Sequence, residues 1–219
     1  MKAVDIDIDY LKTVNYALFH NRIPVCQSVH VVNNSEQPLD DVKVCCKGEF
    51  IKNYESNPVG RINAGETVRI MPFEISPDAS KLAILTERVI TGFTLTITSL
   101  GEIIEEKQYE IELMPYDHWL GTTILPQTLA SFVSPNHPSI NGLVVKAAAA
   151  LKQATGSSVL TAYQTCNSND VRLQTAAVFA AIHQTGIVYR GVPASYEDVG
   201  QRITMPDQVI SNKIGNCIE

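Results

Sequence analysis

Long apolar runs are missing from this 219-residue sequence: none approaches the about 18 residues needed to cross a bilayer. The first residues interleave Asp5, Asp7, Asp9 and Lys12 with apolar positions, so they lack the basic start and apolar centre of a secretory signal. We therefore expect no contact with a membrane and a cytoplasmic location.

Cysteine is scarce, and its spacing excludes two kinds of site. The five cysteines are an odd number without a CxxC pair: Cys26, Cys45, Cys46, Cys166 and Cys217. A chain of this length folds without disulfides, which favours reduced thiols in the cytosol. No zinc site is predicted, and we expect neither a metal nor a cofactor.

Basic residues are too few for a nucleic-acid reader. The chain has 17 basic and 23 acidic side chains, a formal net charge of −6. The negative charge belongs to residues 1–115, whereas residues 116–219 are neutral, so neither part offers a basic footprint. The GxxxxGK[ST] phosphate loop is also missing, which removes the reason to expect ATP binding.

Residues 1–115 alternate apolar and polar positions with a period of two, which is typical of strands. The runs cover 4–10, 28–32, 42–46, 67–70, 93–98 and 108–113. Turn-forming residues separate them, as in Asn33-Asn34-Ser35 and Ser76-Pro77-Asp78. Several short strands at this spacing predict an immunoglobulin-like β-sandwich over residues 1–115.

Residues 116–219 change to a helical period. Pro138 begins a segment with apolar residues every three or four positions, and Gly156 follows it as a C-terminal cap. A second helix should begin around Ser168-Asn169-Asp170 and end near Gly186. Because this helix is apolar nearly all round, we expect it to be buried at the centre of its domain.

Cys217 is the candidate chemical group. A glycine turn leading into a cysteine that opens a helix places the thiol where the helix N-terminus lowers its pKa. By spacing alone, however, a lone Gly-x-Cys is more often a plain buried thiol. Both interpretations stay open at this point.

A family resemblance covers about the last hundred residues. It is carried by the stretches Tyr116-Asp117-His118-Trp119-Leu120-Gly121, Leu125–Pro138, Gly186–Tyr189, Pro193–Arg202, Met205–Ile210 and Lys213–Cys217. These stretches resemble a segment near the start of large bacterial proteins related to superfamily I DNA helicases. In that family an N-terminal sandwich and a transglutaminase-like segment precede the motor domains.

The resemblance implies that Cys217 occupies the nucleophile position of a Cys-His-Asp constellation, with the histidine and aspartate downstream. Thiol catalysis needs a base within hydrogen-bond reach, itself oriented by a third group. The histidines of this chain precede the cysteine, so the resemblance does not assign the base to any of them: His20, His30, His118, His137 and His183.

Two further features have a structural interpretation as well as a functional one. Asp5, Asp7 and Asp9 share one face of a strand and could bind a cation, but they fit better as the charged face of an edge strand. Trp119, the only tryptophan, follows the change of pattern and fits a hinge between the two parts better than a ligand platform.

We therefore predict an α+β chain, with an immunoglobulin-like sandwich over 1–115 and the mainly helical N-terminal part of a transglutaminase-like domain over 116–219. The expected function is a non-catalytic accessory region that binds a protein partner or downstream domains of the same protein. The alternative is part of a cysteine-nucleophile enzyme centred on Cys217. Exposed apolar helix faces would also allow a homodimer.

Overall fold

The computed structural model describes residues 2–161, 163–192 and 194–219. The chain divides into two compact units, Met1–His118 (unit 1) and Trp119–Glu219 (unit 2). The division lies three residues beyond the change of sequence pattern at Pro115. Pro193, which belongs to the family resemblance, lies outside the described residues.

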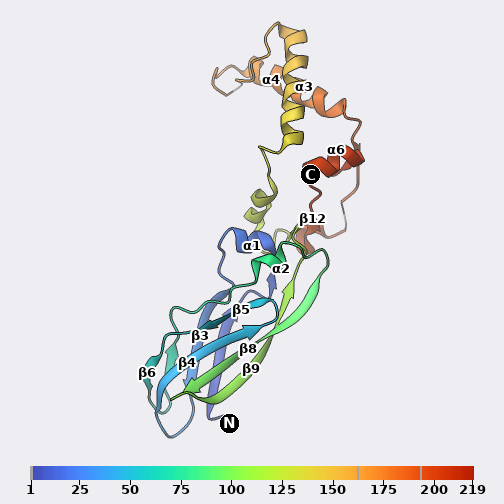
Figure 1. Cartoon of the computed structure of the whole chain (residues 1–219). Helices are drawn as coiled ribbons and strands as arrows, with labels where there is room; N and C mark the ends of the chain where they lie inside the picture. Colours follow the sequence, from blue (N-terminus) through green and yellow to red (C-terminus); the bar gives the residue numbers. More distant parts are fainter. Residues whose placement is uncertain (1, 162, 193) are drawn as a thin grey trace. The chain divides into compact units, whose positions relative to one another are not determined.

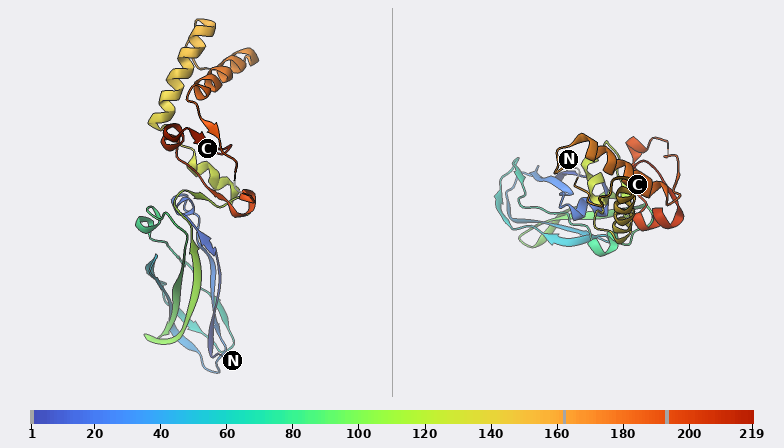
Figure 2. Two further views of the ribbon diagram at one scale, coloured as in Figure 1. Left: turned by 90° about the vertical axis from the view of Figure 1, so that its right-hand side faces the viewer. Right: turned by 90° about the horizontal axis from the view of Figure 1, so that it is seen from above.

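Unit 1 is a sandwich of two sheets, which face each other in the side view of Figure 2. The three-stranded sheet has the order β1 (Val4–Tyr10), β3 (Cys26–Asn33), β7 (Thr67–Arg69). The larger sheet has the order β2 (Thr13–Val14), β9 (Glu102–Leu113), β8 (Val89–Ser99), β4 (Leu39–Gly48), β5 (Ile51–Glu55), and β6 (Val59–Ile62) also pairs with β4 (Figure 1). Two short helices, α1 (Tyr16–His20) and α2 (Ala79–Leu82), connect strands.

The alternation of the strands builds one core between the sheets. Every second residue of β8 is buried at Phe93, Leu95 and Ile97, and β4 contributes Val42, Val44 and Cys46 in the same way. A strand places successive side chains on opposite faces, so this period puts one face of each sheet in the interior. All six alternating runs lie in or across observed strands, and the fold is a β-sandwich followed by helices, as predicted.

Where the two sheets meet, side chains of β1 and β9 donate hydrogen bonds to main-chain carbonyl groups of the other strand. Lys107 Nζ and Tyr109 Oη of β9 both donate to the carbonyl of Ile6 in β1, at 2.9 and 3.2 Å. In the other direction, Tyr10 Oη donates to the carbonyl of Glu110 at 2.7 Å. An edge strand with free main-chain groups invites pairing with another chain, and these bonds reduce that tendency.

Unit 2 is mainly helical. It contains η1 (Pro126–Phe132), α3 (Pro138–Thr155), α4 (Ser168–His183), α5 (Tyr196–Val199) and α6 (Pro206–Asn212). Trp119 of β10 (His118–Trp119) and β12 (Gln201–Arg202) belong to one small sheet, and β11 (Val188–Tyr189) pairs in parallel with β13 (Ile214–Gly215) in another. No helix in the described part of the chain has the length and apolar character to span a bilayer.

The two long helices begin and end near the predicted positions. α3 starts at Pro138 and stops before Gly156, whose φ of 83° suits a residue without a Cβ. α4 is capped by Asn167, whose side chain accepts from the Asn169 N–H, one residue before the predicted cap.

The prediction that the second helix is a buried central helix was wrong. Only Gln174, Ala177 and Ala181 of α4 are buried, all on the side that packs against α3. Phe179 is 69% exposed on another side of the helix. An all-round apolar helix becomes central only where other elements cover its remaining faces, and the described residues supply cover on one side.

Candidate functional site

Cys217 lies in a bend directly after β13 and is exposed. α6 and β13 precede it, and the expectation from the Gly-x-Cys spacing that it opens a helix stays a prediction. Within the described residues its thiol makes no hydrogen bond or ion pair. The structure presents Cys217 as an accessible, unpaired thiol.

A buried carboxylate holds the turn around this cysteine. The Glu219 side chain is fully buried, and its Oε1 accepts from Arg190 Nη2 at 2.8 Å and from the Thr204 N–H at 2.9 Å. Its Oε2 accepts from the Asn216 N–H at 2.9 Å. One carboxylate thus ties together three chain segments and closes the turn that carries Cys217. Charge-assisted bonds of this kind are stronger than those between neutral groups.

Asn216 supports the turn from inside. Its Oδ1 accepts from the Ile218 N–H at 2.9 Å and lies 3.5 Å from Nε2 of the buried Gln201. Because Asn216 Oδ1 already accepts a bond, the atom of Gln201 that faces it must be the amide nitrogen. The remaining atom, Gln201 Oε1, is buried. Among the buried side-chain nitrogen and oxygen atoms of the described residues, it is the one without a hydrogen-bond partner.

An apolar groove of about 350 Å³ borders the turn. Its walls come from the beginning of α3, the end of α4, β11 and α6, with Ile140, Leu143, Ile182 and Val209 among the lining residues. Asn216 and Glu219 form the side nearest to Cys217. Cys217 itself is not among the lining residues, although the residue before it, Asn216, is.

No histidine in the described residues is placed as a base for Cys217. His137 is engaged elsewhere: its Nδ1 accepts from the Ser139 N–H at 3.3 Å, and its Nε2 lies 3.8 Å from Asp207 Oδ1. The rings of His20 and His183 stack on Tyr16 and Phe179. The downstream base that the family resemblance implies stays a prediction.

The other cysteines differ from Cys217 in exposure. Burial raises the pKa of Cys26 to about 11 and that of Cys46 to about 12, so both are neutral thiols at physiological pH. Burial also raises the pKa of Cys45, whose thiol donates to Glu55 Oε2 at 3.5 Å. Cys166 is exposed on a turn and serves as a natural comparison for Cys217.

The acidic face of β1 lies at the edge of a sheet, and one of its carboxylates pairs with a lysine. β1 is the edge strand of its sheet, and Lys107 Nζ lies 3.2 Å from Asp5 Oδ1. Burial is the largest single influence on Asp5 and opposes its ionisation, but the hydrogen bonds from Lys107 and the Ile6 N–H, together with the charges of Lys107 and Lys2, outweigh it, so the pKa of that carboxyl is lowered. Among the residues that the structure describes, no group of three metal-ligating side chains occurs.

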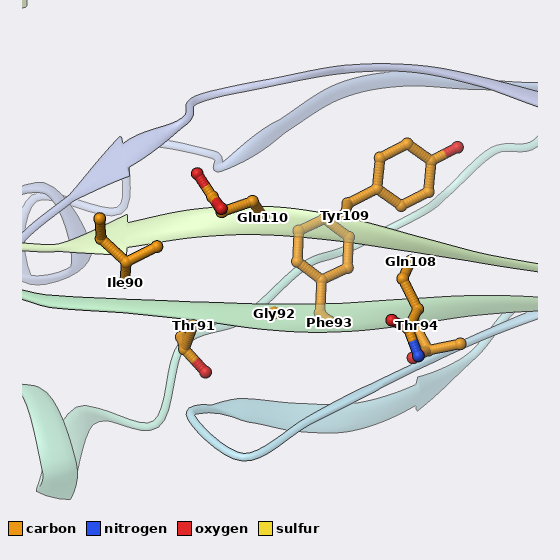
Figure 3. A pocket seen from close by; sticks show the side chains of 8 residues that line it. All are labelled: Ile90, Thr91, Gly92, Phe93, Thr94, Gln108, Tyr109 and Glu110. Carbon is orange, nitrogen blue, oxygen red and sulfur yellow. The ribbon is translucent and has the colours of Figure 1, made fainter.

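A second hollow, of about 490 Å³, lies on β8 and β9 in unit 1 (Figure 3). Gly92 lies among its lining residues, with Ile90, Thr94, Gln108 and Glu110. Figure 3 shows the rings of Phe93 and Tyr109 side by side; their centroids are 5.5 Å apart in a stacked arrangement. Its single carboxylate, Glu110, has no second carboxylate and no basic side chain beside it in the lining, so this hollow has the chemistry of a sheet surface.

No protein-family model and no curated protein matches the chain. Solved structures that resemble it include a red sea bream transglutaminase, at 12% identity and a TM-score of 0.36, with 52% of this chain and 15% of that chain covered. A CARDB domain from Pyrococcus furiosus matches at 13% identity and a TM-score of 0.28, covering 52% of this chain and 98% of that domain. A PapD-like domain of human CEP192 matches at 9% identity and a TM-score of 0.26, covering 52% and 85%.

The match to the transglutaminase spans 15% of that enzyme's chain, so the activity of the enzyme is not transferred to this protein. What the structure adds at Cys217 is the cluster of Glu219, Arg190 and Thr204, which sequence reasoning missed. The three residues are far apart in the chain and carry no periodic signal. Only the burial of an acidic side chain, visible in three dimensions, identifies them.

Proposed function

We propose that the chain is a non-catalytic accessory region that binds protein, and that unit 2 provides the binding surface. One observation supports this proposal: the apolar residues of the two units are distributed differently. Of the 30 buried apolar residues in the described part of the chain, 22 belong to unit 1, although the units are of similar length. Of the 17 large apolar residues that the structure describes as exposed, 12 belong to unit 2.

The exposed apolar residues of unit 2 include neighbouring positions on the outer sides of α3 and α4. Val144 and Val145 of α3 are 46% and 69% exposed, and Val178 and Phe179 of α4 are 43% and 69% exposed. Burial of apolar surface contributes about 25 cal/mol per Å². A surface of this composition is therefore stabilised by a covering protein.

The resemblance to helicase-related proteins supports the choice of partner. Residues 116–217 carry the resemblance, so we propose that the sandwich is immunoglobulin-like, that unit 2 is part of a transglutaminase-like domain, and that another domain of the same large protein covers α3 and α4. When that domain is missing, a second copy of the chain would bind the same surface.

The test uses two exposed positions and one matched control. Val145→Ser and Phe179→Ser together should lower the fluorescence of bound 8-anilinonaphthalene-1-sulfonate and reduce self-association in sedimentation velocity, at unchanged Tm. Ile90→Ser, at a comparably exposed position of unit 1, should change neither. A monomeric chain that does not bind the dye, or an equal effect of the control, would contradict the proposal.

The alternative is a thiol enzyme that is completed by downstream residues. The observation in its favour is the exposed Cys217 on a turn fixed by a buried carboxylate. Rates of iodoacetamide alkylation between pH 5 and 9 on Cys166→Ser and Cys217→Ser proteins compare the two exposed thiols directly. An activated Cys217 reacts well below the pH at which Cys166 does. Equal profiles leave Cys217 an ordinary surface thiol.

A further inference from the structure

A groove of about 600 Å³ opens in unit 1, outside the site described above. One wall is formed by the chain from Phe19 to Cys26, and the other by Phe73 to Pro77. Most of the lining is apolar; the charged or titratable members are His20, Arg22, Glu74 and the buried Cys26. It has the size and composition of a ligand-binding cleft.

The groove lies where two paired segments separate. β3 and β7 are antiparallel, with His30 opposite Arg69, Val31 opposite Val68 and Val32 opposite Thr67. The pairing continues to the hydrogen bond from the Ile70 N–H to the Val29 carbonyl, at 2.9 Å. In the same register the next residues, 24–26 and 73–75, would face each other, and these are the two walls. Pro24 and Pro72 lack the N–H groups that a continued ladder needs.

The separation leaves main-chain groups without partners. Among the described residues, the N–H and C=O groups of Phe73, Glu74 and Ile75 make no hydrogen bond. The chain re-enters regular pairing only at Ser76, whose carbonyl accepts from the Lys52 N–H at 2.8 Å. Main-chain groups beside an apolar cleft are satisfied most fully by another main chain.

The charges of the two walls differ. His20 and Arg22 lie on the first wall and Glu74 on the second, and within the described residues neither Arg22 nor Glu74 belongs to an ion pair. A carboxylate in the groove would be attracted to the first wall. The net charge of residues 1–115 is negative. Arg22 is therefore a local positive charge, and an acidic group of a ligand would be oriented toward it.

We infer that this groove binds an extended peptide by strand addition, with a bulky apolar side chain between Phe19, Phe73 and Ile75 and a neighbouring acidic side chain toward Arg22. Phe73, Glu74 and Ile75 supply the main-chain hydrogen bonds, and the apolar walls supply the pocket for the side chain. The inference concerns unit 1 and is independent of the surface on α3 and α4.

The experiment measures fluorescence anisotropy of labelled peptide pools added to the whole chain. The first pool carries Leu, Ile or Phe followed by Asp or Glu, with Ser, Thr and Val elsewhere. Two matched pools replace the apolar residue with Ser or the acidic residue with Lys. We expect the first pool to bind most tightly, with Arg22→Glu weakening it about three- to tenfold at low salt. Arg172→Glu, the same change on exposed α4, should have no effect.

Hydrogen exchange gives a readout that does not depend on a variant. The amide protons of Phe73, Glu74 and Ile75 should exchange at least about tenfold more slowly when the peptide is bound. Absence of binding by any pool below about 1 mM would overturn the inference. So would binding without protection of these amides, or a groove that takes up 8-anilinonaphthalene-1-sulfonate but none of the peptides.

Discussion

Replacing Asn33, a small side chain, should lower the free energy of unfolding of the sandwich by a large amount. Asn33 lies at the end of β3 and is fully buried. Its Nδ2 donates to the carbonyls of Gln37, Ile62 and Asn63, at 2.8, 3.1 and 3.1 Å. Its Oδ1 accepts from the N–H and the hydroxyl of Ser35, at 3.1 and 2.7 Å. One amide therefore joins β3 to two separate turns.

The cost of Asn33→Ala follows from these bonds. The amide has two hydrogens, so three carbonyls share two donors, and the substitution removes the equivalent of about four hydrogen bonds at roughly 0.5 to 1.5 kcal/mol each. Water can reach the exposed side of the turns, but the bond to the Ile62 carbonyl is buried, so water does not readily replace it. We expect a loss of about 3 to 4 kcal/mol and a fall in Tm of roughly 10 to 15 °C.

The neighbouring residue provides the control. Asn34 is exposed, and its main-chain N–H donates to the Ala3 carbonyl, a bond that Asn34→Ala retains. Urea unfolding followed by far-ultraviolet circular dichroism should show a shift of less than about 0.5 kcal/mol for Asn34→Ala. Equal stabilities of the two variants would refute the role of the buried amide.

Three further predictions concern the thiols. In the native protein at pH 8, Ellman's reagent should react rapidly with the exposed Cys166 and Cys217, and with all five cysteines only in concentrated urea. The folded pKa of Cys46 is about 12 against 9.0 for the free thiol, so the contribution of this thiol to folding stability is intact below pH 9 and should fall by about 1.4 kcal/mol per pH unit between pH 9 and 11, and Cys26, with a folded pKa of about 11, should add a similar decline. Cys46→Val should flatten that decline by the same amount in urea titrations. Glu219→Gln, which cannot accept bonds on both sides, should change the alkylation rate of Cys217 relative to Cys166; an unchanged ratio would show that the carboxylate does not fix the turn.

Strand periodicity predicted the sandwich because its core is formed by alternating residues of long strands. β4, β8 and β9 each bury every second side chain over part of their length, and the sequence shows the same period. β5 and β6 were missed for the opposite reason. β5 buries only Ile51 and β6 only Ile62, and each is held by pairing with β4. A strand with one buried side chain has no period to detect.

Helix ends were predictable where a single residue determines them, as Pro138 and Gly156 do for α3. The environment of α4 was not predictable from the sequence. Its composition indicates how much apolar surface the helix carries, but whether that surface is covered depends on the other elements present. The buried Ala177 and the exposed Phe179 lie on nearly opposite sides of the helix, and because both sides are apolar the sequence does not say which of them is covered.

The turn at Cys217 and the peptide groove also differ in how far the sequence predicts them. Cys217 was a candidate from the sequence because a glycine two residues before a cysteine is a local pattern. Glu219, which closes the turn around it, acts through Arg190 and Thr204, and the peptide groove depends on two segments about 50 residues apart that separate after Val29 and Ile70. Pro24 and Pro72 lack the N–H group that a continued ladder needs, but by themselves they do not bring two segments together. That the two ends face each other follows from the β3–β7 register, and within the described residues the main-chain groups of Phe73, Glu74 and Ile75 are left without hydrogen-bond partners.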